Sequence, residues 1–200
     1  GWAVKISPDG QEIVYRERYM NDDQTLSNNI VRYTIHAQKR AVIAKGQRDL
    51  SKLVPTGHAN SVGINGNLHI VLTRNGKAII LTPNGVDEAY NWASLSPNGT
   101  KILYYVSGKG CYTCDLSGKN PHFISLDCRA PQWYDDHIII GMHDEDNGKW
   151  LTASAIVAYD MQGQKQILVH KEKMAIYPYA ANGKIAYSTA GGEVYIMNIQ

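Results

Sequence analysis

Cysteines are the residues of this sequence whose type and spacing first suggest chemistry. Cys111 and Cys114 are separated by two residues, as in redox motifs and zinc half-sites, and Cys128 is the third cysteine. A structural zinc site needs four ligands, and a redox pair of this spacing begins a helix. Cys111 and Cys114 instead lie in a predicted strand, where residues three apart point to opposite faces. We interpret all three as small buried thiols; a disulfide from Cys128 to Cys111 or to Cys114 is the alternative.

The seven histidines include no pair with the spacing of a metalloprotease motif. His137 and His143 share one face of a predicted strand, but six residues at about 3.3 Å each place them about 20 Å apart. Because metal ligands lie ~2 Å from the ion, these two cannot hold one metal together. We expect no metal and no cofactor. The alternative is a lyase whose central metal is held by histidines from several repeats.

An acidic segment offers the best candidate for a cation-binding loop. Asp144 and Asp146 stand at alternate positions before Gly148, like the opening of a calcium loop, but the bidentate glutamate at the far end is missing. The same residues are favoured in solvated hairpin tips, and this is our interpretation. Trp150 lies just beyond the tip. Asp144, Asp146 and Trp150 are therefore candidates for exposed recognition residues.

A second group of recognition candidates lies in residues 19–29, which we interpret as an insertion between two strands. Tyr19, Asp22 and Asp23 are the side chains suited to contacts with a partner. Loops on a rigid scaffold are where binding specificity usually lies. The alternative is an insertion that is merely tolerated.

No arrangement for catalysis is present in the sequence. It contains no Gly-x-Ser-x-Gly elbow, no phosphate-binding Walker loop and no Gly-x-Gly-x-x-Gly segment. Asp22-Asp23 and Asp135-Asp136 are adjacent pairs, not the separated carboxylates that flank a sugar in glycosidases. We expect no catalytic residue in this chain.

The amino-acid composition limits the size of the fold and the classes of partner that we expect. The chain has 200 residues, 44% of them hydrophobic, which suffices for one sizeable domain or two small ones. The net charge is only +2 and the basic residues are scattered, so nucleic acid is not an expected partner. No apolar run approaches the ~20 residues of a membrane helix, and we expect no membrane insertion. No signal segment is present; we interpret Gly1 as a cloning scar or a processed end.

A repeated sequence segment predicts the fold on which all these residues lie. The chain reads ISPDGQEIVYRER from residue 6 and LSPNGTKILYYVSG from residue 95. In both segments, the serine side chain can hydrogen-bond the turn backbone, proline sets its φ to about −65°, and glycine takes the left-handed conformation. Weaker copies have turns at 63–66, 134–137 and 180–183. The five units begin at residues 7, 63, 96, 134 and 180, a mean interval of about 43 that is typical of propeller blades.

The strands that follow each turn predict how the units pack. Every unit continues with a second and a third strand, and three units add a fourth. The second strands KILYYV, HIIIGM and NLHIVLT are apolar on both faces, whereas a sheet with one wet face alternates. No segment has a helical period, so another sheet must cover each face. The alternative, a β-sandwich, predicts no fixed repeat. We therefore expect an all-β fold, a β-propeller of about five four-stranded antiparallel blades.

The repeat resembles that of the TolB-like, or PD40 (WD40-like), β-propellers. The turns at 7–10 and 96–99, Pro131 and Trp133 before the fourth turn, and the final strand at 193–199 carry the resemblance, which covers almost the whole chain. It implies a fold rather than an activity, because the repeat recurs in envelope scaffolds and in propeller domains of prolyl-oligopeptidase-like enzymes. It also implies a periplasmic, cell-surface or secreted location in a bacterium.

We expect residues 1–200 to form a single propeller, with units at about 2–53, 54–86, 87–126, 127–171 and 172–200. The last unit ends at its third strand, so either the last blade is incomplete or the chain is part of a larger propeller. The favoured function is a non-catalytic binding or scaffold domain that recognises a protein or glycan through its loops or central face. The alternative is the propeller of a larger peptidase or sugar-active enzyme whose catalytic residues lie outside this chain.

Overall fold

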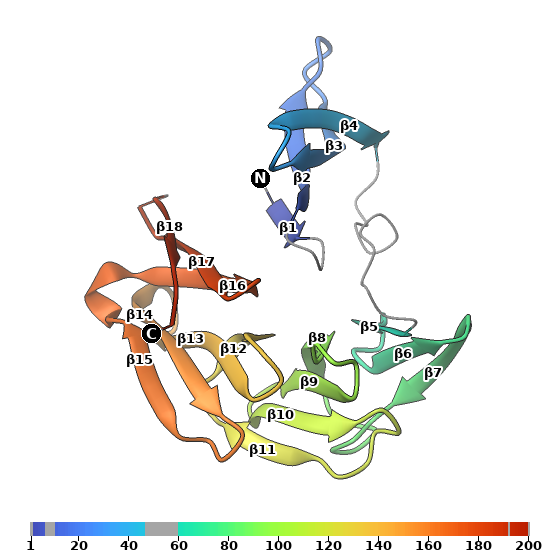
Figure 1. Cartoon of the computed structure of the whole chain (residues 1–200), viewed down its shortest axis with the longest axis vertical. Coiled ribbons are helices and arrows are strands. Elements are labelled where there is room, and N and C mark those ends of the chain that lie inside the picture. Colours follow the sequence, from blue (N-terminus) through green and yellow to red (C-terminus); the bar gives the residue numbers. More distant parts are fainter. Residues whose placement is uncertain (1, 7–10, 47–59, 192, 200) are drawn as a thin grey trace. The chain divides into compact units, whose positions relative to one another are not determined.

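The computed structural model describes residues 2–6, 11–46, 60–191 and 193–199. Within them the chain is all-β, with five small antiparallel sheets and one short 3-10 turn, η1 (Lys171–Lys173) (Figure 1). The expected fold class, a β-propeller of five blades, is confirmed. The turn predicted at 7–10 lies outside the described residues.

Each sheet is formed by consecutive strands that pair in sequence order. The first sheet contains β1 (Trp2–Ile6), β2 (Glu12–Met20), β3 (Leu26–Thr34) and β4 (Lys39–Lys45). The second contains β5 (Asn60–Ile64), β6 (Ile70–Arg74) and β7 (Lys77–Leu81). The third contains β8 (Tyr90–Leu95), β9 (Lys101–Val106), β10 (Gly110–Asp115) and β11 (His122–Ser125). The fourth contains β12 (Arg129–Trp133), β13 (Ile138–Asp146), β14 (Leu151–Asp160) and β15 (Lys165–Val169). The fifth contains β16 (Ala175–Ala181), β17 (Lys184–Thr189) and β18 (Val194–Met197).

The second sheet, like the fifth, has three strands in the described part of the chain. Residues 82–89 alone connect β7 to β8. The Tyr90 hydroxyl holds this connection, accepting from Asn84 N and donating to Gly85 O, both at 2.9 Å. These eight residues must pass from the third strand of one sheet to the first strand of the next, which leaves no length for a fourth strand.

The hairpin between β8 and β9 has the turn chemistry that the sequence predicts. Ser96 Oγ accepts hydrogen bonds from the backbone N–H groups of Thr100 (3.1 Å) and Lys101 (3.0 Å). Gly99 N donates to Ser96 O at 2.8 Å, and Gly99 has a φ of +69°, which favours glycine. The repeated phrase is therefore a local folding signal with a structural cause.

Replacing this serine should be costly. Ser96→Ala is expected to lower the free energy of unfolding by about 1–3 kcal/mol, because the buried Ser96 hydroxyl is the acceptor for Lys101 N and one of two acceptors, with Asn98 Oδ1, for Thr100 N. Urea unfolding measures the change. Ser117→Ala, which removes an exposed hydroxyl bonded to Asp115 Oδ1, is the control and should change stability by less than about 0.5 kcal/mol. Equal effects of the two substitutions would contradict this prediction.

Two of the weaker turns lie later in the chain than predicted. Gly63 pairs with Val71 inside the β5–β6 ladder, so the turn predicted at 63–66 begins at Asn65 instead. Asn65 Oδ1 caps it by accepting from His69 N at 2.9 Å. The position of this turn is therefore set by Asn65, whose side chain bonds the turn backbone, and not by Gly63 or Gly66.

The turn predicted at 180–183 contains only Asn182 and Gly183, with φ of +51° and +72°. Ala181 pairs with Lys184, so the strands continue to the edge of the turn. Positive φ at both central residues is the two-residue hairpin geometry that suits strand twist.

Residues 19–29 are not an inserted loop, which corrects the sequence interpretation. β2 and β3 are nine residues each, and Tyr19 pairs with Ser27 within the ladder. Only Asn21–Thr25 form the tip of this hairpin. The polar composition of residues 19–29 suggested a loop. Polar residues also fit the ends of two extended strands, because alternate side chains there point to solvent.

The chain divides into two compact units, Gly1–His58 and Ala59–Gln200. The first unit contains the β1–β4 sheet and a small apolar cluster, formed by Val14 and Ile30 with Ile43 and Ala44. The second unit contains the other four sheets.

In the second unit, each pair of successive sheets buries an apolar cluster between facing surfaces. The second and third sheets contribute Ile70, Leu72, Leu81, Tyr90, Ile102, Tyr104 and Val106. The third and fourth contribute Leu103, Cys111, Ile124, Cys128, Trp133, Ile139, Val157 and Tyr159. The fourth and fifth contribute Ile140, Met142, Ile156, Ala158, Ala175 and Ile185. The sheets therefore cover one another's faces, as the doubly apolar strands predicted.

Hydrogen bonds between neighbouring inner hairpins add to this packing. Trp133 Nε1 donates to Ser94 O at 3.5 Å, and Asn98 N donates to Asp136 Oδ1 at 2.9 Å. Both bonds join the third sheet to the fourth. Trp133, the aromatic residue before its turn, thus both fills the apolar cluster and bonds its own sheet to the preceding one.

A bulge recurs in the innermost strands. Pairing with the second strand slips by one residue in four of the five sheets, within Trp2–Lys5, Asn91–Ser94, Arg129–Gln132 and Ile176–Tyr179. Three of these bulges contain a non-glycine residue with positive φ, namely Trp92 (+51°), Ala130 (+46°) and Tyr177 (+51°). Bulges increase the twist of a strand and re-aim its side chains. Trp92 and Tyr177 are exposed there.

Candidate functional site

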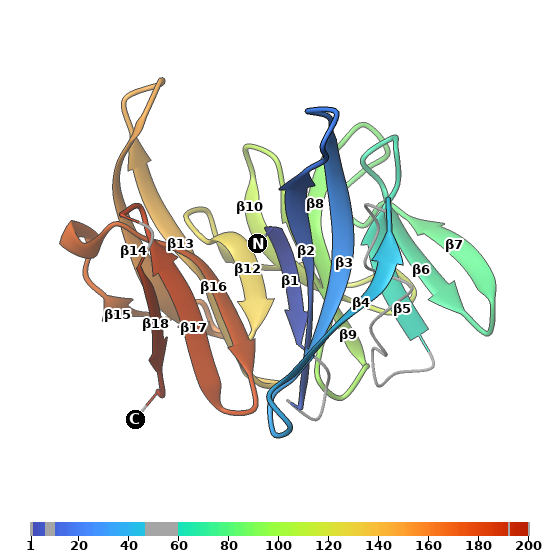
Figure 2. The ribbon, with the colours of Figure 1, turned by 90° about the horizontal axis from the view of Figure 1, so that it is seen from above.

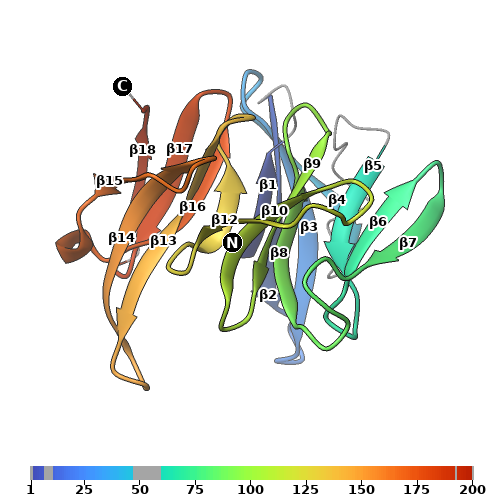
Figure 3. The same ribbon diagram turned by 90° about the horizontal axis from the view of Figure 1, so that it is seen from below.

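The hairpin formed by β13 and β14 is the most prominent exposed feature of the fourth sheet. Met142 pairs with Arg129 and is the last residue of β13 that pairs with β12. β13 continues for four more residues beyond it. β14 likewise pairs with β15 only from Ile156 onward. The tip of the hairpin therefore projects past its neighbours, as Figures 2 and 3 show.

Local hydrogen bonds hold the tip in one conformation. Asn147 Oδ1 accepts from Lys149 N (3.1 Å) and Trp150 N (2.8 Å), and Asp146 Oδ1 accepts from Gly148 N (2.8 Å). Gly148 has a φ of +83°, which the turn requires and which glycine adopts without strain. The backbone at Trp150 is therefore held by hydrogen bonds within the tip itself.

An open depression of about 330 Å³ lies beside this tip, lined by Arg129, Asp146, Gly148, Lys149, Trp150 and Leu151. Trp150 is 67% exposed, and the Lys149 ammonium lies 5.7 Å from the centre of its ring. Neither Arg129 nor Lys149 makes an ion pair with another described residue. The depression thus presents a tryptophan, two cations and one carboxylate to solvent.

The other carboxylates of the hairpin are engaged within the protein. Asp144 Oδ1 accepts from Ser154 Oγ at 2.8 Å. Glu145 Oε1 lies 2.8 Å from Lys171 Nζ, and the hydrogen bond and charge of this lysine lower the pKa of Glu145. Asp144 therefore supports the hairpin, whereas Asp146 faces the depression.

The remaining recognition candidates lie on the β2–β3 hairpin of the first unit. Tyr19 is 36% exposed, and Asp22 is exposed. Asp23 Oδ1 accepts from Thr25 Oγ1 (2.6 Å) and Thr25 N (3.0 Å), and these bonds lower the pKa of Asp23. The Asp23 carboxylate therefore caps the turn of its own hairpin. The structure brings Asp146 and Trp150 into one site and places Tyr19, Asp22 and Asp23 on a separate hairpin.

The cysteines and histidines do not form a metal site within the described residues. Cys111 and Cys114 belong to different apolar clusters, as residues on opposite faces of a strand should. His143 Nδ1 lies 3.8 Å from Asp127 Oδ2, and no group of three or more His, Cys, Asp or Glu side chains converges in the part of the chain that the structure describes. No helix there has the length and apolar character to cross a membrane.

Sequence reasoning missed Arg129 and Lys149. Lys149 could have been found as the neighbour of Trp150 at the predicted tip. Arg129 begins the inner strand of the same unit, about twenty residues earlier, and only the long β13–β14 hairpin brings the two together. No local pattern signals that contact.

Comparison with known proteins identifies the fold. No protein-family model matches the chain, and no curated protein sequence matches it. Among solved structures it is similar to TolB from Acinetobacter baumannii, with 16% identity and a TM-score of 0.54 over 98% of this chain and 51% of that one. It is similar to the tricorn protease, with 7% identity and a TM-score of 0.56 over 99% and 25% of the two chains. It is also similar to an oligogalacturonate lyase in complex with manganese, with 10% identity and a TM-score of 0.52 over 100% and 65%.

The chain thus has the fold of TolB-like β-propellers. It spans about half the length of TolB, a quarter of the tricorn protease and less than two thirds of the lyase. These proteins bear different functions on one architecture, so the likeness identifies the fold alone.

Proposed function

We propose that this chain is a non-catalytic β-propeller domain that binds a protein or glycan partner in the bacterial envelope through its β13–β14 hairpin. One observation carries the proposal: Trp150 is 67% exposed beside a depression that also presents Arg129, Asp146 and Lys149. Tryptophan and arginine are enriched among the few residues that contribute most of the binding energy at protein interfaces. The depression beside the tip of the hairpin presents both of these residue types, and this combination supports a binding role.

The order of the tip supports a binding role. Two hydrogen bonds to Asn147 hold the backbone at Lys149 and Trp150, so less backbone conformational entropy is lost when a partner binds. The depression is open rather than enclosed, which suits a surface contact better than the sequestered chemistry of an enzyme. The resemblance to TolB-like repeats supports an envelope location.

Trp150→Ala is expected to weaken binding at least about 30-fold, the effect of losing a hot spot of ~2 kcal/mol. The measurement is the affinity of the purified chain for ligands found by a glycan panel and by pull-down from an envelope extract. Ile80→Ala is the matched control, because Ile80 is 62% exposed on β7, in another sheet of the same unit. Unchanged affinity in Trp150→Ala, with the same fold by circular dichroism, would remove this hairpin from the proposed site.

The second candidate function is the propeller domain of a larger peptidase or sugar-active enzyme. It is favoured because the chain matches only 25% of a protease and 65% of a lyase. The full-length gene separates the two: a hydrolase or lyase domain in the same polypeptide supports the enzyme. Turnover of peptides or oligosaccharides by the purified chain, abolished by a point substitution, would contradict a non-catalytic role.

A further inference from the structure

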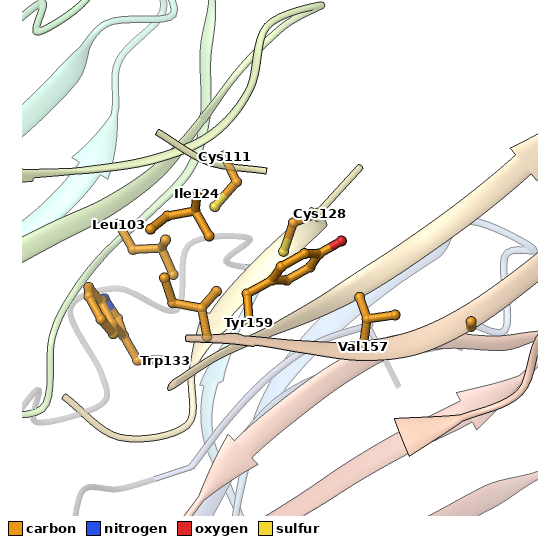
Figure 4. Close-up of a cluster of buried hydrophobic side chains, with 9 residues drawn as sticks. Leu103, Cys111, Ile124, Cys128, Trp133, Val157 and Tyr159 are labelled. Atoms are coloured by element: carbon orange, nitrogen blue, oxygen red, sulfur yellow. The ribbon is translucent and has the colours of Figure 1, made fainter. Parts of the chain in front are cut away.

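Two of the three buried thiols meet between the third and fourth sheets. Cys111 lies in β10, Cys128 lies immediately before β12, and both are fully buried in the same apolar cluster. Figure 4 shows both sulfur atoms within this cluster, together with Tyr159. The two side chains are close enough that Cys128 contributes, after burial, to the raised pKa of the Cys111 thiol. All three cysteines are free in this structure.

The Cys128 sulfur fills a space beside β13. Gly141 of β13 faces it so closely that a Cβ at that position would lie 2.5 Å from the Cys128 Sγ. The absence of a side chain at Gly141 therefore creates the space that the sulfur fills. Cys114 packs on the opposite face of β10, in the cluster shared with the second sheet, and does not belong to the pair.

We propose that Cys111 and Cys128 form a disulfide when the chain folds under oxidising conditions, and that this bond fastens the third sheet to the fourth. It would close a loop containing residues 112–127, which include the whole of β11. That strand is four residues long and lies at the outer edge of its sheet, where few ladder bonds hold it. In the chain-entropy account, a disulfide stabilises by restricting the unfolded chain, and the effect increases with the length of the closed loop.

The chemistry is thiol–disulfide exchange with a small disulfide, for which oxidised glutathione serves as the probe. One cysteine thiolate attacks a glutathione sulfur, forms a mixed disulfide and releases one glutathione thiolate. The second cysteine thiolate attacks the protein sulfur of that mixed disulfide and releases the other. Two protein thiols lose two electrons and two protons, and one glutathione disulfide becomes two glutathione thiols.

The bond must form before the two sheets pack together. In the folded chain both thiols are fully buried, so the oxidant cannot reach them. Burial, with the adjacent Cys128 thiol, also raises the pKa of Cys111 well above its ordinary value, which suppresses the reactive thiolate. The folded reduced protein should therefore resist an oxidant that the refolding chain accepts.

The test refolds the whole chain from urea in reduced or in oxidised glutathione and counts thiols after denaturation. Oxidised refolding is expected to leave one free thiol, on Cys114, and to yield a crosslinked peptide containing Cys111 and Cys128. Its Tm should exceed that of the reduced protein by roughly 5–10 °C. The reduced protein, folded first and then exposed to oxidised glutathione, should keep all three thiols.

Variants make the assignment specific. Cys114→Ala should preserve both the crosslink and the Tm difference, whereas Cys128→Ala should abolish both; Cys128→Ser replaces it if the alanine variant fails to fold. Three free thiols after oxidised refolding, a crosslink that includes Cys114, or oxidation of the already folded protein at the same rate would each overturn the proposal.

Discussion

Gly110→Ala is expected to destabilise the protein by about 3–5 kcal/mol, the combined cost of a strained backbone and a steric clash. Gly110 begins β10 with a φ of +102°, outside the conformations that side chains tolerate. A Cβ there would lie 2.4 Å from Ser125 O and 2.8 Å from Leu126 Cα. Both are backbone atoms of the adjacent outer strand and its end, so the clash is relieved only by separating the strands.

A neighbouring glycine provides the matched control. Gly108 lies in the same hairpin with a φ of +72°, but nothing lies within 4 Å of a Cβ built there. Gly108→Ala should therefore show the conformational cost alone, about 1 kcal/mol. Urea unfolding measures the free energy of unfolding of the two variants. The comparison holds when both have the same m-value, the slope of that free energy against urea concentration. Equal losses of stability at the two positions would contradict the close approach of β10 to residues 125–126.

Stability is expected to fall steeply above about pH 9, because the propeller buries tyrosine and cysteine side chains between its sheets. Burial raises the pKa of Tyr159 to about 12 and that of Cys114 to about 12. Burial also raises the pKa of Tyr104 and of Tyr90. These groups stay protonated in the folded chain at pH values where they ionise in the unfolded one.

The sign follows from proton binding. Above the unfolded pKa values, about 9 for cysteine and 10 for tyrosine, the folded chain holds more protons than the unfolded chain. The contribution of each group is thus complete below its unfolded pKa and is lost as pH rises toward its folded value. Each group can lower the free energy of unfolding by at most about 1.4 kcal/mol per pH unit.

Urea unfolding from pH 7 to pH 12 tests this expectation. The free energy of unfolding should be nearly constant to about pH 9 and should then decline with increasing slope. Tyr159→Phe removes one ionising hydroxyl and should flatten the decline between about pH 10 and pH 12. Tyr19→Phe, at a position 36% exposed, is the control and should leave the pH dependence unchanged. A flat profile to pH 12 would show that these hydroxyls and thiols are not sequestered.

The pH profile and the glycine pair test different parts of one architecture. The first measures whether side chains are sealed between sheets, and the second measures how closely strands approach within a sheet. Only the pH profile depends on the face-to-face packing that the doubly apolar strands predicted.

Several parts of the fold were determined by the sequence alone because their causes are local. The Ser-Pro-Asn-Gly turn forms where it was predicted, since Ser96 bonds the next backbone groups and Gly99 supplies the positive φ. The strands of every sheet were predicted from short apolar runs between turns. The opposite orientation of Cys111 and Cys114 followed from the two-residue period of a strand.

Other parts were decided only by tertiary structure, because their causes act between segments distant in the sequence. The bulges at Trp92 and Tyr177 arise from pairing with the second strand and have no common residue pattern. Arg129 joins Asp146 and Trp150 because a nine-residue strand carries the tip of the hairpin to the start of β12. Local side-chain chemistry thus determined the repeated blade. Strand pairing within the fourth sheet determined the exposed site, and packing between the third and fourth sheets brought Cys111 and Cys128 into one cluster.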